Sequence, residues 1–64
     1  MVLQLTVPNM ACSACSDTIT KAIKAIDPAA TVQADPKTKL VNVDTQAAET
    51  TIKQAITDAG YTIA

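Results

Sequence analysis

The sequence predicts an α+β domain built from four strands and two helices in the order strand, helix, strand, strand, helix, strand. Short alternating apolar segments occupy residues 2–7, 31–35 and 40–44, and two longer segments carry apolar residues at helical spacing. All of them fit within 64 residues, which is one small domain. The compact solution for this order is the ferredoxin-like fold, a four-stranded antiparallel sheet with both helices on one face.

The first strand and the first helix are separated by a short turn. In residues 2–7, Leu3, Leu5 and Val7 share one face, and Pro8 with Asn9 ends the strand. Ser13 is expected to cap the helix that follows, and the residue before Pro28 is expected to end it. The apolar stripe of this helix is predicted to contain Cys15, Ile19, Ala22, Ile23 and Ile26.

The second half of the chain is predicted to contain a hairpin, a helix and a last strand. Strands over residues 31–35 and 40–44 flank a turn that begins at Asp35-Pro36, with Val41 and Val43 facing inward. Thr45 is expected to cap a helix that runs to about Ala59. After it, Gly60 supplies a left-handed residue, and residues 61–64 form a short fourth strand.

This topology predicts that three loops lie at one end of the molecule. If the first strand runs upward, the first helix starts at the top, the hairpin turns there and the second helix ends there. The segment with Cys12 and Cys15, the hairpin with Lys37 and Lys39, and the junction at Tyr61 should therefore lie close together. We expect the two lysines to be solvated hairpin residues; the alternative is that they meet an acidic patch on a partner.

Composition excludes several classes of function. The net charge is -1, and the chain has five lysines, no arginine and one aromatic residue, so nucleic-acid binding is not expected. Many of the apolar residues are alanines and the chain has no Phe or Trp, so the core is too thin for a deep substrate pocket, which argues against an enzyme. No stretch resembles a membrane span or a secretory signal, so we expect no direct membrane insertion and a cytoplasmic location.

Two cysteines three residues apart, Cys12 and Cys15, are the chemically informative feature of a chain that has no histidine. One reading is a structural pair of small buried side chains. A second is thiol-disulfide exchange, although the chain is shorter than thioredoxin-like domains and lacks aromatic neighbours. A third, which we favour, is a site for a soft metal ion, because a helix N-terminus stabilises thiolates.

The small number of donors favours Cu(I) as the metal. A closed structural Zn(II) site takes four protein ligands, which two cysteines without histidine do not supply. Cu(I) is soft and suits thiolates, and two sulfurs leave it open to a third thiolate. We expect Met10 to be a core side chain that supports the loop, rather than a ligand. Tyr61 is either an ordinary strand residue or a side chain that shields the metal.

The residues Met10-x-Cys12-x-x-Cys15 after a first strand, together with Gly60-Tyr61, resemble the heavy-metal-associated domain over essentially the whole chain. Within that family the chain is most similar to small bacterial copper chaperones, including those of cyanobacteria. The resemblance implies one domain over residues 1–64 that binds Cu(I) through Cys12 and Cys15.

The resemblance also implies partners. Such chaperones deliver Cu(I) to metal-binding domains of copper-transporting P-type ATPases, and a copper-bridged homodimer is a further form.

Ala11 differs from the Asp that often precedes the first cysteine in Zn(II)-selective members, whereas mercury-binding relatives share the motif. Asn9 stands where many relatives have Gly, which we expect to alter the flexibility of the loop.

Overall fold

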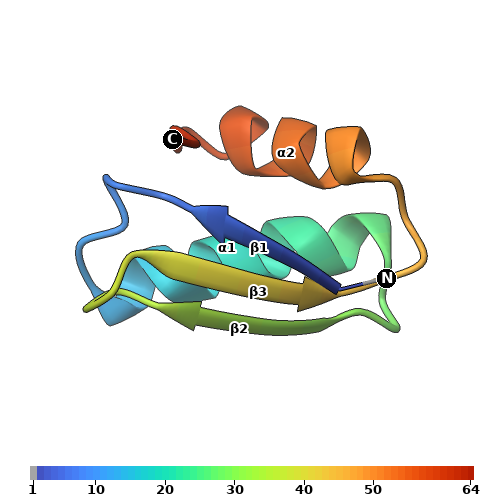
Figure 1. Cartoon of the computed structure of the whole chain (residues 1–64), viewed down its shortest axis with the longest axis horizontal. Helices are drawn as coiled ribbons and strands as arrows, with labels where there is room; N and C mark the ends of the chain where they lie inside the picture. Colours follow the sequence, from blue (N-terminus) through green and yellow to red (C-terminus); the bar gives the residue numbers. More distant parts are fainter. Residues whose placement is uncertain (1) are drawn as a thin grey trace.

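The computed structural model describes residues 2–64, which form an antiparallel sheet and two helices. Figure 1 shows the strands as one layer, with one helix behind the sheet and the other along its upper side in that view. In chain order the elements are β1 (Val2–Thr6), α1 (Ser13–Ile26), β2 (Thr31–Asp35), β3 (Leu40–Asp44) and α2 (Glu49–Asp58). The predicted α+β class is confirmed, and the two strands of the hairpin have the predicted bounds.

The strand order is β1-β3-β2, and β3 is antiparallel to both neighbours. The register places Asn42 opposite Gln4 on one side and opposite Gln33 on the other, so a row of amides crosses the face of the sheet that points away from the helices. Because side chains alternate along a strand, the neighbouring row contains Val43 between Leu3 and Val32. This second row faces the helices.

The core lies between the apolar face of the sheet and both helices. Residues with no exposed surface include Val41 and Val43 from β3, Ile19 and Ile23 from α1, and Ile52 and Ile56 from α2. Ile26 was expected in the buried stripe of α1, but it is 47% exposed. That expectation was wrong because Ile26 is the last residue of α1, where the helix ends and the chain turns away.

The predicted fourth strand is absent from the described residues, so the sheet has three strands there. The segment after Gly60 does approach β1, and the amide of Ala64 donates to the carbonyl of Thr6 over 2.9 Å. Beyond β1 the chain continues with Pro8, which has no N–H to donate to a neighbouring strand. The amide of Thr62 donates to the side chain of Asn9 and not to a backbone carbonyl, so the described contacts of this segment do not make a fourth strand.

Both helices have N-caps that differ from the predicted ones. The N-cap of α1 is Cys12 rather than Ser13, so this helix begins one residue earlier, and no side chain caps it. The N-cap of α2 is Ala48 rather than Thr45, so this helix begins later. The Thr45 hydroxyl accepts from the amide of Ala47 and donates to Asp27, and it thereby stabilises the turn before the helix.

Neither helix among residues 2–64 has the length and apolar character of a membrane span.

Candidate metal centre

Three segments that are far apart in the sequence meet at one end of the molecule, at the left of Figure 1. They are the loop before α1, the hairpin between β2 and β3, and the segment that follows α2. Hydrogen bonds join them: the ammonium of Lys39 donates to the carbonyl of Met10 over 2.9 Å, and the amide of Thr62 donates to Asn9 over 3.0 Å. The predicted meeting of the three loops is therefore confirmed.

The two cysteine sulfurs lie side by side at the start of α1. Their Sγ atoms are 3.3 Å apart, and both thiols are free. Cys12 is exposed, and Cys15 is half-buried in the first turn of the helix. No acidic residue lies in that first turn to compete for the unpaired N–H groups and the positive end of the helix dipole. The surroundings thus favour thiolates that an incoming ion or protein can reach.

Tyr61 interacts directly with the second cysteine. Hydrogen bonding from the Tyr61 hydroxyl, followed by the backbone of Ala11 and the thiol of Cys12, lowers the pKa of Cys15 from 9.0 to about 7. The same contact with Cys15 raises the pKa of Tyr61. Each group therefore stabilises the form in which the tyrosine is the donor and the Cys15 thiolate is the acceptor.

Removal of the Tyr61 hydroxyl should raise the pKa of Cys15. With a pKa of about 7, roughly half of Cys15 is thiolate at pH 7, and the thiolate fraction falls as the pH drops below that value. In Tyr61→Phe the pKa should move up toward 9.0, so most of Cys15 should be thiol at pH 7. The thiolate absorbance, followed across a pH titration of metal-free protein, measures this change. Thr57→Val, which removes an exposed hydroxyl from α2, is the control; an equal shift in both variants would contradict the assignment.

Gly60 directs the chain so that Tyr61 reaches this end. Its φ is +95°, a left-handed conformation that glycine adopts without strain. The amide of Gly60 donates to Thr57 and the amide of Tyr61 donates to Ile56, which is the Schellman arrangement at the end of a helix. Tyr61 is half-buried and packs against the core while its hydroxyl meets Cys15.

Met10 lies in the core, with no exposed surface. Its amide donates to the carbonyl of Val7 over 3.0 Å, which closes a turn with Pro8 and Asn9 at its centre. The thioether is therefore packed beneath the loop, whereas Cys12 is exposed two residues later.

Sequence reasoning missed two residues that hold the loop. Lys39 is not simply solvated: it is half-buried, its ammonium contacts Met10, and its carbonyl accepts from the amide of Val7 over 2.8 Å. Its φ of 67° is the one positive value at a non-glycine position in residues 2–64. Asn9 was expected to affect loop flexibility, but its contact with Thr62 was not foreseen. Neither contact follows from local patterns, since the partners are 29 and 53 positions apart.

Among residues 2–64, the cysteine pair is not part of a larger cluster of Cys, His, Asp or Glu side chains. In the part of the chain that the structure describes, no group of three or more Cys, Asp, Glu or His side chains is positioned to hold a metal ion. Cys12 and Cys15 are thus a pair of soft donors without a third Cys, His, Asp or Glu grouped with them in the described residues. This donor set suits a soft ion of low coordination number and does not complete a tetrahedral zinc site.

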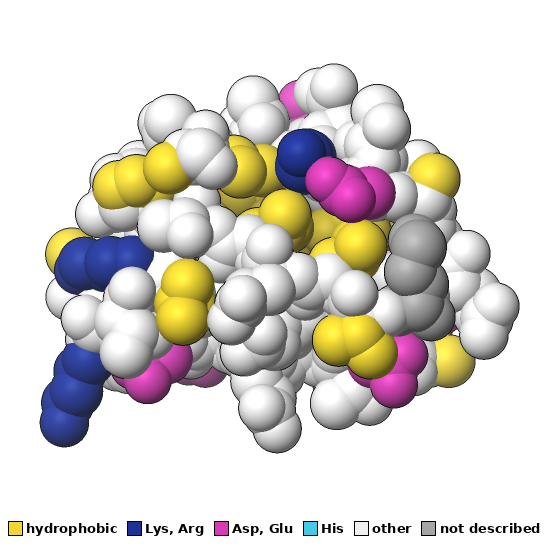
Figure 2. Space-filling view, viewed as in Figure 1, with side chains coloured by type: hydrophobic (Ala, Val, Ile, Leu, Met, Phe, Trp, Pro, Cys, Tyr) yellow, Lys and Arg dark blue, Asp and Glu magenta, His cyan; other side chains and the backbone are white. Residues whose placement is uncertain are grey.

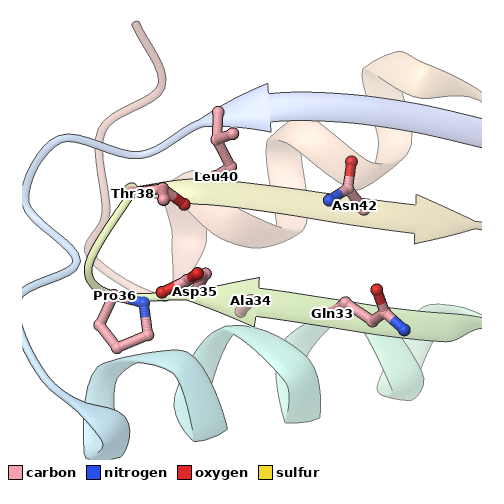
Figure 3. Close-up of a pocket in the computed structure, with 7 residues that line it drawn as sticks. All are labelled: Gln33, Ala34, Asp35, Pro36, Thr38, Leu40 and Asn42. Atoms are coloured by element: carbon pink, nitrogen blue, oxygen red, sulfur yellow. The ribbon is translucent and has the colours of Figure 1, made fainter.

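A broad depression along β2, β3 and the hairpin turn offers no comparable chemistry. Its lining is shown in Figure 3: Gln33, Ala34, Asp35, Pro36, Thr38, Leu40 and Asn42, from β2, β3 and the turn between them. These side chains include neither sulfur nor a basic group.

In the view of Figure 2, dark blue lysine side chains stand at the left end, where the hairpin lies in Figure 1, and apolar side chains are spread in small groups.

Comparison with known proteins identifies a family with this fold and motif. The model of the heavy-metal-associated domain matches residues 4–62. Among solved structures, the trimeric Cu1 form of a histidine-to-tyrosine variant of the copper chaperone Atx1 from Synechocystis PCC6803 is 42% identical, with a TM-score of 0.94; the match covers 97% of this chain and 98% of that chain. A comparison with curated protein sequences gives no match.

Two further structures show the range of metals among similar proteins. The solution structure of ScAtx1, a cyanobacterial copper metallochaperone, is 41% identical over 100% of both chains, with a TM-score of 0.83. A gold-binding protein is 37% identical, with a TM-score of 0.90, and the match covers 94% of this chain and 92% of that chain. Metallochaperones carry metal and do not catalyse a reaction, so these similarities agree with the expectation that the chain is not an enzyme.

Proposed function

Because this chain belongs to the heavy-metal-associated domain family, we propose that it is a Cu(I) metallochaperone, one domain over residues 1–64, that holds copper on Cys12 and Cys15. The observation that carries the proposal is the pair of free thiols, 3.3 Å apart and open to solvent, at the N-terminus of α1. The similarity to copper chaperones supports copper as the cargo.

The copper would be exchanged through its unfilled coordination positions. Cu(I) bound to two thiolates can accept a third thiolate before either bond to Cys12 or Cys15 breaks. A thiolate of the partner forms a new bond to the copper first, after which one of the original sulfurs leaves and takes a proton from solvent. The partner's second thiolate then binds and the other original sulfur leaves in the same way, so the copper keeps at least two sulfur ligands throughout. Copper therefore passes between proteins without becoming a free ion.

The partner in this proposal is another domain with a paired-cysteine loop, such as the metal-binding domain of a copper-transporting P-type ATPase in contact with the cytoplasm. It would dock at the end that holds Cys12 and Tyr61, because only there can its sulfurs reach the metal. A second copy of this chain has the same exposed thiols, so a copper-bridged homodimer is a further form that the site allows. We propose a cytoplasmic location, where thiols stay reduced.

A transfer experiment tests the function. Copper-loaded protein is mixed with the metal-free metal-binding domain of a copper ATPase, in the presence of a chelator that captures only free Cu(I). We expect the domain to receive the copper faster than this protein releases it spontaneously, since each step exchanges one sulfur ligand for another. The copper content of both proteins is measured after rapid separation.

Two controls accompany the transfer. The acceptor with both of its cysteines changed to serine should receive no copper, and copper-loaded protein without acceptor should lose copper to the chelator at its slower intrinsic rate. If the chelator captures the copper before the intact acceptor does, delivery occurs through solution and the chaperone mechanism is wrong.

A further inference from the structure

The turn that precedes the cysteines is held firmly at several points. Met10 closes it with a hydrogen bond to Val7 and is itself fully buried. Lys39 holds both ends, since its carbonyl accepts from the amide of Val7 and its ammonium donates to the carbonyl of Met10. Asn9 lies at the centre of this turn, so its backbone is anchored although its side chain is exposed.

The segment that carries Tyr61 packs its Tyr61 and Ile63 side chains against the core and has few backbone hydrogen bonds to the rest of the molecule. It is not a strand, and beyond the Schellman turn its backbone is tied at two places: the amide of Thr62 donates to Asn9 Oδ1 over 3.0 Å, and the amide of Ala64 donates to Thr6. The first of these ties is one residue from Tyr61. The Asn9 side chain therefore connects the firmly held turn to the backbone beside the tyrosine that contacts Cys15.

We propose that Asn9 is a positioning residue that holds Tyr61 over the cysteine pair and so slows the loss of copper. The inference rests on the proposed function, and it assigns Asn9 no contact with the metal. Asn9 acts through the amide of Thr62, which sets the path of the chain after Gly60. Tyr61 in turn covers Cys15 and limits the approach of water and competing ligands to the metal.

Asn9→Ala removes the contact without straining the turn. The φ of Asn9 is not positive, so alanine can adopt the same backbone conformation. Asn9→Asp keeps an oxygen at the position of Oδ1 and should restore the hydrogen bond. Gln54→Ala is the matched control, because it also removes one exposed amide hydrogen bond, to Asp58, but lies on the surface of α2.

The first measurement uses metal-free protein, so that it does not depend on copper. Tyr61 is the one aromatic residue of the chain, and its fluorescence reports its environment directly. In Asn9→Ala we expect faster hydrogen exchange at the amide of Thr62 and stronger quenching of Tyr61 by acrylamide. The variants Asn9→Asp and Gln54→Ala should both resemble the wild type. Unchanged exchange and quenching in Asn9→Ala would overturn the positioning role even if copper binding is intact.

The second measurement follows the rate at which a chelator removes Cu(I). One lost hydrogen bond of ordinary strength should speed removal from Asn9→Ala about two- to tenfold. Tyr61→Ala should speed it at least as much, and the double variant should be no faster than Tyr61→Ala, since both changes act through one side chain. Multiplicative effects in the double variant would show that Asn9 acts independently of Tyr61 and would overturn the proposal. Failure of the wild type to bind Cu(I) would instead refute the proposed function and leave the first measurement valid.

Discussion

Cys12→Ser and Cys15→Ser should each abolish tight Cu(I) binding while the protein remains folded. A serine hydroxyl is not a soft ligand, and the described residues offer no third group to replace the lost thiolate. Changing a residue that only hydrogen-bonds to a metal ligand lowers metal affinity roughly 10- to 100-fold. The loss of affinity on removing a ligand itself should be larger. Competition with a Cu(I) chelator under anaerobic conditions measures the affinity.

The fold should tolerate these substitutions. Cys12 is exposed and Cys15 is only half-buried, and substitutions at the surface usually change the free energy of unfolding by less than about 0.5 kcal/mol. Ser13→Ala, between the two cysteines, is the matched control and should keep both stability and copper affinity. Wild-type affinity in either serine variant would show that the metal is held elsewhere.

Met10→Ala should destabilise the protein more than any change at the thiols. Met10 has no exposed surface, and truncation of a buried Met to Ala costs about 2–5 kcal/mol. A core in a chain of this size rarely supplies more than about 3–5 kcal/mol, so a large share of Met10→Ala should be unfolded. Urea unfolding followed by circular dichroism measures the loss.

Met10→Leu separates packing from metal binding. Leucine keeps the volume and apolar character of the side chain, so the cost should stay below about 1.5 kcal/mol. Because Met10 is fully buried whereas Cys12 is exposed, Met10→Leu should bind Cu(I) nearly as well as the wild type. A folded Met10→Leu protein that loses copper as completely as the cysteine variants would identify the thioether as a ligand.

Local patterns in the sequence were sufficient for much of the fold. The alternation around Val41 and Val43 predicted β3 with its observed bounds, and Gly60 was identified as the left-handed residue after α2. These features follow from the period of side chains along a strand and from the freedom of glycine at positive φ, which are properties of a few neighbouring residues. The order of the elements then predicted that the loop with the cysteines and the junction at Tyr61 would lie at one end of the molecule, as they do; the interaction of Tyr61 with Cys15 was found only in the structure.

The boundaries of elements were less predictable, because competing partners decide them. Thr45 was a reasonable helix cap, yet its hydroxyl bonds to Ala47 and to Asp27 from the end of α1, and α2 begins at Glu49. The apolar spacing of α1 included Ile26, but spacing alone does not indicate where a helix passes beyond the sheet that covers it.

The sequence by itself determined the fold class, the end of the molecule that carries the chemistry, and a pair of thiols with no histidine beside them. Only the tertiary structure decided how that end is built. The contacts of Lys39 with Met10 and of Asn9 with Thr62 join residues 29 and 53 positions apart, and the second lies in the segment that was expected to form the fourth strand. Such contacts form only after packing has brought the loops together, because each depends on where a side chain from a separate element is placed.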